Sequence, residues 1–211
     1  MIKIISFDLD GTLVENTFAD NVWLEGFPRL YAREKNIMID EAREFLFKEY
    51  DKVGMDRKEW YDIDWWFKRF HIKEDWHDLL SDFRAKIHAF PESKNVISNL
   101  SNRYKLIIVS NAKREFVDIQ LSHTGLKPYF HSIFSSLSDF DSVKKFPEVY
   151  KKVCDILNVK VDEIIHIGDN KDFDFLSPSK IGIKSFYLDR GRTDEGEGVV
   201  HSLSDFEKII G

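Results

Sequence analysis

Two carboxylates, those of Asp8 and Asp10, lie two residues apart in the stretch FDLDGT, directly after the apolar residues 2–6. Burying a carboxylate is costly in free energy unless it is paired with a cation or bound to a metal. In an extended chain, side chains at positions i and i+2 point the same way, roughly 6–7 Å apart. The two carboxylates can therefore flank one reacting group, and Gly11 permits the tight turn or close backbone approach that follows.

A second acidic segment, GDNKDFD, follows the apolar residues 163–167. It carries the carboxylates of Asp169, Asp172 and Asp174, without a cluster of histidines and cysteines. A site made of oxygen ligands alone suits Mg²⁺. Taken by itself, the segment also has a purely structural interpretation, in which Asp169 caps a helix and the other two carboxylates are favourable charges in its first turn.

Two further segments are candidates for binding an anion. Ser110 ends an apolar run, and a helix is predicted to begin near Ala112. A hydroxyl group together with the backbone N–H groups of a helix start forms an anion site, although Ser110 alone is better explained as a simple helix cap. A lysine just before Pro147 could reach a phosphate, whereas in isolation Lys144 and Lys145 are typical of solvated surface.

The elements that must position these residues alternate along the outer parts of the chain. Short β-branched runs without polar alternation are typical of parallel strands that are covered on both faces. Their alternation with helical patterns predicts a doubly wound α/β sheet, in which ligands bind beyond the carboxyl ends of the strands. We predict strands over 2–6, 105–110, 133–135, 163–167 and 183–188, and helices over 93–102, 113–124, 147–158, 172–180 and 203–209.

Residues 16–88 have a different sequence pattern, with amphipathic helical periodicity and no clear strand pattern. All five tryptophans of the chain fall in this segment. We interpret it as a small helical bundle that uses large aromatic side chains to build its core, while a substrate pocket lined by aromatic residues is the alternative. The helical patterns cover residues 18–34, 40–52, 60–70 and 76–87.

Composition limits the remaining possibilities. The 211 residues suit one large domain or a domain with a sizeable insertion, and a net charge of −6 does not favour a nucleic-acid partner. The single cysteine, Cys154, rules out an intramolecular disulfide and a multi-cysteine zinc site. No stretch approaches the ~20 apolar residues that span a membrane, and the first six residues are too short for a signal sequence. We therefore expect a cytoplasmic protein without a membrane partner.

An acidic strand end, a hydroxyl strand end, a loop lysine and a second acidic strand end follow one another in this order. With this arrangement the chain resembles the haloacid dehalogenase-like (HAD) hydrolase superfamily, in its phosphatase branch. The matching motifs are DLDGT at residues 8–12, SN at 110–111, KKFP at 144–147 and GDNKDFD at 168–174.

The resemblance implies a division of the chain into two parts. Residues 1–15 and 89–211 would form the family's mostly parallel, Rossmann-like α/β catalytic core. Residues 16–88, inserted between the first two motifs, look like the family's helical cap of the first subclass.

The resemblance also implies a Mg²⁺-dependent phosphatase that hydrolyses a small phosphorylated metabolite through an aspartyl-phosphate intermediate. Asp8 would be the nucleophile, and Asp10 the general acid and base. The side chains of Asp8 and Asp169 and the backbone carbonyl of Asp10 would bind the metal, with Asp174 in support. Phosphate would be held by Ser110, Asn111 and Lys144.

Two departures from the family pattern leave alternatives open. The lysine motif commonly reads Lys-Pro-Asp-Pro, and alignment on Pro147 favours Lys144 over Lys145 as the phosphate lysine. In the last motif, alignment on Gly168-Asp169 and on Gly182 makes Asp174 the second acid and Asp172 the alternative.

Other functions are compatible with the same core. A sugar-phosphate mutase, an intramolecular phosphotransferase, would differ mainly in its cap, and a non-catalytic binding module would have lost the chemistry. A dehalogenase is disfavoured, because that branch of the family lacks the acid that Asp10 provides. The sequence leaves open the substrate and the choice between monomer and homodimer.

Overall fold

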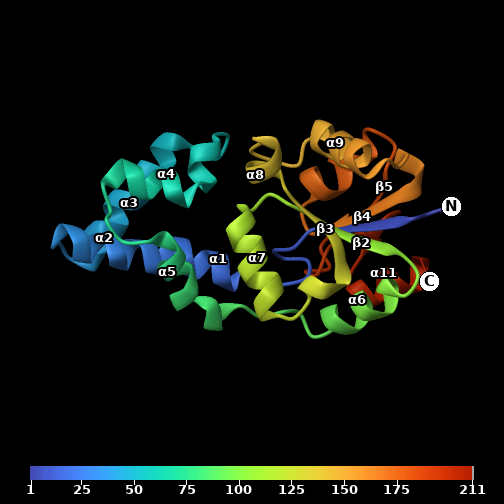
Figure 1. Ribbon diagram of the computed structural model, residues 1–211, viewed down its shortest axis with the longest axis horizontal. Coiled ribbons are helices and arrows are strands. Elements are labelled where there is room, and N and C mark those ends of the chain that lie inside the picture. Colours follow the sequence, from blue (N-terminus) through green and yellow to red (C-terminus); the bar gives the residue numbers. More distant parts are fainter. Residues whose placement is uncertain (211) are drawn as a thin grey trace. The chain divides into compact units, whose positions relative to one another are not determined.

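The computed structural model describes residues 1–210 of the chain, and its central feature is a six-stranded sheet (Figure 1). The strand order is β3-β2-β1-β4-β5-β6, and every neighbouring pair is parallel. This doubly wound parallel sheet confirms the predicted fold class. The strands are β1 (Ile4–Phe7), β2 (Lys105–Ser110), β3 (Phe130–Ser135), β4 (Ile164–Gly168), β5 (Lys184–Leu188) and β6 (Val199–Val200).

Helices cover both faces of the sheet. Successive residues of a strand point to opposite faces, so each strand contributes side chains to both helical layers. On one face, Ile5 and Phe7 of β1 pack in a cluster with residues of α6 (Ser93–Ser101), α7 (Arg114–His123) and α11 (Leu203–Ile210). On the other face, Ile4 packs with residues of α9 (Pro147–Leu157). Figure 1 shows α6 and α11 on the side of the sheet opposite α9. β1 is buried along its whole length, which explains why its sequence shows no polar alternation.

The chain divides into two compact units, residues 1–15 with 89–211 and residues 16–88. All of residues 16–88 are described, and none of them lies in a strand. Its elements are α1 (Thr17–Asn21), the π-helical η1 (Val22–Gly26), α2 (Phe27–Lys35), α3 (Ile39–Val53), η2 (Lys58–Tyr61), α4 (Ile63–Phe70), α5 (Trp76–Asp82) and η3 (Arg84–Lys86).

Aromatic side chains build the interior of the second unit. Trp66 is fully buried and lies 4.9 Å from the ring of Tyr50, while Phe27 stacks on Phe67 at 5.3 Å. Large rings bury much apolar area each, so a unit of this size can assemble a core from few residues. These contacts assign the central aromatic residues to packing rather than to a binding surface.

Some elements of the first unit escape sequence reasoning. The predicted helix over residues 172–180 is a π-helical segment, η6 (Lys171–Leu176), followed by the short α10 (Ser177–Ser179). Two short elements, β6 and α8 (Ser136–Phe140), were not predicted, because elements of two and five residues are too short to show a period. Short 3₁₀ turns complete the unit: η4 (Lys127–Tyr129) and η5 (Val161–Glu163).

Helices in the described part of the chain, residues 1–210, all fall short of the length and apolar character needed to cross a membrane.

Candidate active site

The acidic motifs follow two strands that are neighbours in the sheet. β1 pairs with β4 so that Phe7 lies opposite Ile167, and the backbone N–H of Asp8 donates to the carbonyl of Ile167 at 2.9 Å. Asp8 and Asp169 therefore leave the sheet at the same edge. The strand order reverses between β1 and β4, and the crevice at such a switch point is where open α/β sheets bind their ligands.

Three carboxylates converge at this point. Asp8, Asp169 and Asp174 each offer an oxygen atom, and these atoms all lie within 4.8 Å of one another. Asp174 is fully buried and Asp8 is nearly so, whereas Asp172 is exposed and lies outside the group. Among the alternatives in the last motif, the structure thus brings Asp174 to the cluster.

Two glycines let the backbone approach these carboxylates closely. A Cβ atom on Gly11, whose φ is +77°, would lie 2.1 Å from Oδ2 of Asp169. A Cβ atom on Gly168 would lie 2.3 Å from Cγ of Asp174. No other residue type fits at either position without displacing a carboxylate of the cluster.

Lys145 supplies the positive charge inside the cluster. Its side chain is fully buried, and its ammonium group pairs with Asp8 and, at 2.5 Å, with Oδ1 of Asp174. Lys144, which alignment on Pro147 favours, instead places its ammonium 5.4 Å from the centre of the Phe173 ring. The structure therefore places the runner-up, Lys145, beside Asp8. Neighbouring residues of a loop point in different directions, and sequence spacing cannot tell which of them turns inward.

The loop that carries Lys145 is tied down by its backbone. The N–H of Lys145 donates to Oδ1 of Asn111 at 2.8 Å, and its carbonyl accepts from the hydroxyl of Ser177 at 2.6 Å. Asn111 also accepts a bond from the hydroxyl of Ser136 at 3.3 Å. Ser110, at the end of β2, accepts from the backbone N–H of Ala112 at 3.1 Å. The second motif thus lies at the same edge of the sheet and holds the lysine loop.

A buried polar network that sequence reasoning missed lies behind Asp174. His166 contacts Oδ1 of Asp174 through Nε2 at 3.0 Å and the hydroxyl of Ser6 through Nδ1 at 2.8 Å. The hydroxyl of Tyr150 donates to the carbonyl of Phe173 at 2.8 Å and lies 3.0 Å from Nε2 of His166. The signal in the sequence was a histidine in the middle of the apolar run IIHIG, since a polar side chain buried in a strand needs a partner.

Burial and charge set the protonation of the cluster. Burial, the largest effect, raises the pKa of Asp8 well above its usual value, with Asp174 and Asp169 adding to it and Lys145 opposing it. Burial likewise raises the pKa of Asp169 to about 6. At Asp174, burial is outweighed by Lys145 and His166, which lower its pKa to about 2. One buried ammonium therefore faces three carboxylates, an imbalance that a further cation would correct.

Asp10 is not one of the three clustered carboxylates, although its charge contributes to the raised pKa of Asp169. Its Oδ1 accepts a hydrogen bond from Nε2 of Gln120 at 3.0 Å. Thr12, which follows in the same motif, is fully buried, and its hydroxyl accepts from the backbone N–H of Asp169 at 3.1 Å. The first motif therefore divides its carboxylates, with Asp8 inside the cluster and Asp10 held by a different element.

Arg190, in the loop after β5, is a further residue that sequence reasoning missed. Its guanidinium donates to the carbonyls of Gly11 at 3.2 Å and of Thr12 at 2.7 Å, and pairs with Glu92 at 2.7 Å. The group also lies 3.6 Å from the centre of the Phe90 ring. Arg190 thereby fixes the turn that carries the first motif. A single arginine in a polar loop offers no sequence signal for such a role.

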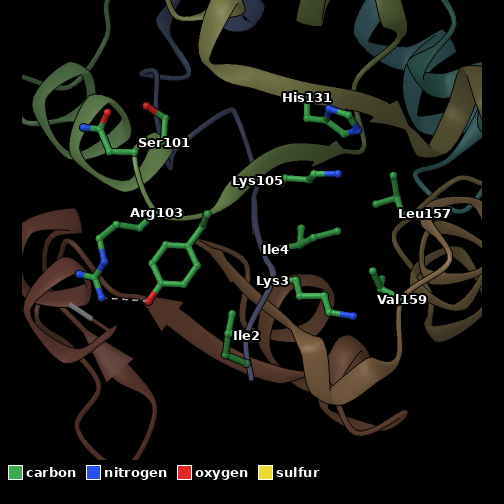
Figure 2. Close-up of a pocket in the computed structure, with 11 residues that line it drawn as sticks. Ile2, Lys3, Ile4, Ser101, Arg103, Lys105, His131, Leu157 and Val159 are labelled. Atoms are coloured by element: carbon green, nitrogen blue, oxygen red, sulfur yellow. Dashed lines mark hydrogen bonds between the residues drawn. The ribbon is translucent and has the colours of Figure 1, made fainter.

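A separate cavity of about 540 Å³ lies at the opposite end of the strands (Figure 2). It is lined at the starts of β1 and β2 by Lys3, Ile4 and Lys105, and by His131 on β3. Lys3 is paired there with Glu163 at 2.6 Å. None of the candidate site residues lines this cavity.

The chain is similar to known proteins in sequence and in fold. A family model described as haloacid dehalogenase-like hydrolase matches residues 5–188. The chain is 25% identical over 221 residues to a phosphoglycolate phosphatase of Vibrio parahaemolyticus, covering 97% of this chain and 91% of that protein. It is 26% identical over 175 residues to pyrophosphatase PpaX of Bacillus cereus, covering 80% and 75% respectively. A solved HAD phosphatase from Thermococcus onnurineus superposes with a TM-score of 0.83 at 26% identity, covering 100% of this chain and 98% of that chain. The chain belongs to the haloacid dehalogenase-like hydrolases.

Proposed function

We propose that this hydrolase is a Mg²⁺-dependent phosphatase that cleaves a small phosphorylated metabolite through an aspartyl-phosphate on Asp8. The observation that carries the proposal is the buried group of Asp8, Asp169 and Asp174 around the ammonium of Lys145. A nucleophilic carboxylate, a cation and an acid–base carboxylate beside it are the parts that covalent phosphoryl transfer needs.

The donor set fits magnesium. The three clustered side chains are all carboxylates, they carry more negative charge than Lys145 balances, and hard oxygen ligands are those that Mg²⁺ prefers. Asp8 and Asp169 would bind the ion with the backbone carbonyl of Asp10, and Asp174 would support it. When bound, Mg²⁺ would neutralise charge on the phosphoryl group and favour attack by an anionic nucleophile.

In the first step, an oxygen of Asp8 forms a bond to phosphorus while the bond from phosphorus to the ester oxygen breaks. Asp10 gives its proton to the departing alkoxide, which leaves as an alcohol. Lys145 favours the ionised form of Asp8 against the effect of burial, and we assign to it a contact with an oxygen of the phosphoryl group. Ser110 and Asn111, at the end of β2, complete the set of groups that we assign to the phosphate.

In the second step, Asp10 takes a proton from a water molecule as the water oxygen attacks phosphorus. The bond between phosphorus and Asp8 breaks, which restores the carboxylate and releases inorganic phosphate. Residues 16–88 act in this proposal as a cap that shuts out bulk water during attack. The named activities of the two curated relatives differ in substrate but share a small phosphorylated molecule, and we assign that class to this chain.

Phosphate release from a panel of small phosphate esters, with and without Mg²⁺, tests the proposal. We expect release that requires the metal, and loss of turnover with retained fold in Asp8→Asn, because an amide is a poor nucleophile. The matched control is Asp172→Asn, an exposed carboxylate of the same acidic segment as Asp169, which should stay active. Near-normal phosphate release by Asp8→Asn would refute the covalent mechanism, and full activity after exhaustive chelation would refute the metal.

A further inference from the structure

Gln120 is an amide in the middle of an apolar helix face. α7 buries four side chains, those of Phe116, Val117, Gln120 and Leu121, and Gln120 is fully buried. Val117 and Leu121 belong to the main core cluster of the sheet. An apolar side chain is expected at this position, because a buried polar group costs free energy unless all of its hydrogen bonds are made.

The hydrogen bonds of the Gln120 side chain are only half made. Its Nε2 donates to Oδ1 of Asp10 at 3.0 Å, but its Oε1 is buried without a partner among residues 1–210. A leucine or methionine would fill similar space and leave no orphan acceptor. Packing therefore does not explain the amide, whereas the bond to Asp10 does. Residues that break a local rule at a cost in stability are expected where function requires them.

The backbone around Asp10 is held independently of this bond. Asp10 and Val14 form an isolated bridge, and the N–H of Gly11 donates to the carbonyl of Val14 at 2.7 Å. These contacts fix the position of the Asp10 backbone. The direction of the Asp10 carboxylate depends on its side-chain torsions, and the hydrogen bond from Gln120 restrains these torsions.

We propose that Gln120 is a positioning residue that holds the carboxylate of Asp10 in the direction required for proton transfer. The inference rests on the proposed function, because it assigns to Gln120 the orientation of the group that serves there as general acid and base. A displacement of about 1 Å at such a group can reduce the rate by roughly 10²-fold.

The test compares Gln120→Leu and Gln120→Met on two aryl phosphates. We expect kcat/KM for phenyl phosphate, a poor leaving group, to fall by about 10-fold to 10²-fold, and that for p-nitrophenyl phosphate to fall clearly less, since a good leaving group needs less protonation. The melting temperature should stay the same or rise, because the buried amide is gone. Leu121→Met alters packing on the same helix but keeps the amide. It should change neither kcat/KM for either ester nor the ratio of the two values by more than about twofold.

A double-mutant cycle with Asp10→Asn separates positioning from other effects. If Gln120 acts through Asp10, Gln120→Leu causes no further loss of kcat/KM in the Asp10→Asn background. An undiminished loss in that background overturns the inference, and so does an equal loss on both esters. Unfolding of both Gln120 variants overturns it too, because the amide would then be needed for stability.

The same data separate this inference from the proposed function. If Asp8→Asn still turns over, the proposed covalent mechanism fails. If Asp8→Asn is inactive and Asp10→Asn discriminates between the two esters while the Gln120 variants do not, the inference alone fails.

Discussion

Lys145 shows how one residue sets the charge balance of the site. It is a fully buried cation that contacts two carboxylates, Asp8 and Asp174, which lie far apart in the sequence. The carboxylates raise the pKa of Lys145 against the opposing effect of burial, so the group stays charged. Removal of one partner from a buried ion pair leaves an uncompensated charge, which makes such residues sensitive to substitution.

Replacing Lys145 with methionine should therefore cost about 3–5 kcal/mol in the free energy of unfolding of the metal-free protein. Turnover should fall as well, since Asp8 would lose the cation that favours its ionised form against burial. Urea unfolding and steady-state phosphate release measure the two effects.

The adjacent Lys144 provides the matched control. Lys144→Met should change stability by less than about 1 kcal/mol, because Lys144 is only half-buried and its ammonium lies over the Phe173 ring. If Lys144→Met proved the more damaging of the two variants, the assignment of the phosphate lysine would return to Lys144.

At the scale of the elements, the turn after β1 is shaped by what lies against it. Arg190 holds the carbonyls of Gly11 and Thr12, while Asp169 after β4 occupies the space that a Cβ on Gly11 would take. The first strand, the fourth strand and the loop after the fifth therefore meet at one glycine.

Gly11→Ala should lower both stability and activity. A residue other than glycine at positive φ costs about 1–2 kcal/mol, and the new Cβ would also displace the Asp169 carboxylate. Misplacing a group of the site should reduce kcat/KM by roughly 10²-fold. Thermal unfolding and phosphate release, each with saturating Mg²⁺, measure the outcome.

Gly125→Ala is the control at this scale. Gly125 also has a positive φ, of +68°, but apart from its chain neighbours no atom lies within 4 Å of the place that a Cβ would take. The variant should lose similar stability and keep its activity. Equal activities in the two variants would show that close approach to Asp169 is unimportant.

For the whole molecule, the protonation of the clustered carboxylates makes both stability and metal binding depend on pH. The pKa of Asp169 is about 6 in the folded protein and 3.8 as its ordinary value. Between these values the folded state binds more protons than the unfolded state, so the contribution of Asp169 to stability is full below about pH 4 and is lost as the pH rises through about 6. Asp174 acts in the opposite sense, and its contribution is lost as the pH falls from about 4 through about 2.

Mg²⁺ binding should accordingly release protons and weaken as the pH falls below about 6. The ion needs the charged carboxylate, so protonation of Asp169 lowers the apparent affinity by up to tenfold per pH unit, roughly, in that range. Calorimetric titrations near pH 5.5 and 7, each in two buffers of different ionisation enthalpy, count the released protons.

Proton release should be larger near pH 5.5 than near pH 7, and smaller in Asp169→Asn than in the unaltered protein near pH 5.5. Asp172→Asn should behave as the unaltered protein does. The same proton count at both pH values would contradict the link between Asp169 and the metal.

The sequence by itself determined the fold class and the family. Buried parallel strands appear in the sequence as short apolar runs, and the alternation of these runs with helical patterns predicts the doubly wound sheet. The order of the motifs along these runs carried the family resemblance, which the match over residues 5–188 confirms. Strand ends also indicated where Asp8 and Asp169 would leave the sheet, because parallel neighbours end at one edge.

Only the tertiary structure decided which groups face one another at that edge. It turned Lys145 rather than Lys144 inward, placed His166 behind Asp174, and brought Gln120 to Asp10 across 110 residues of sequence. The physical reason is that these contacts depend on the direction of single side chains and on packing between elements. A local pattern records whether a residue is buried, but it does not record which distant residue shares the space.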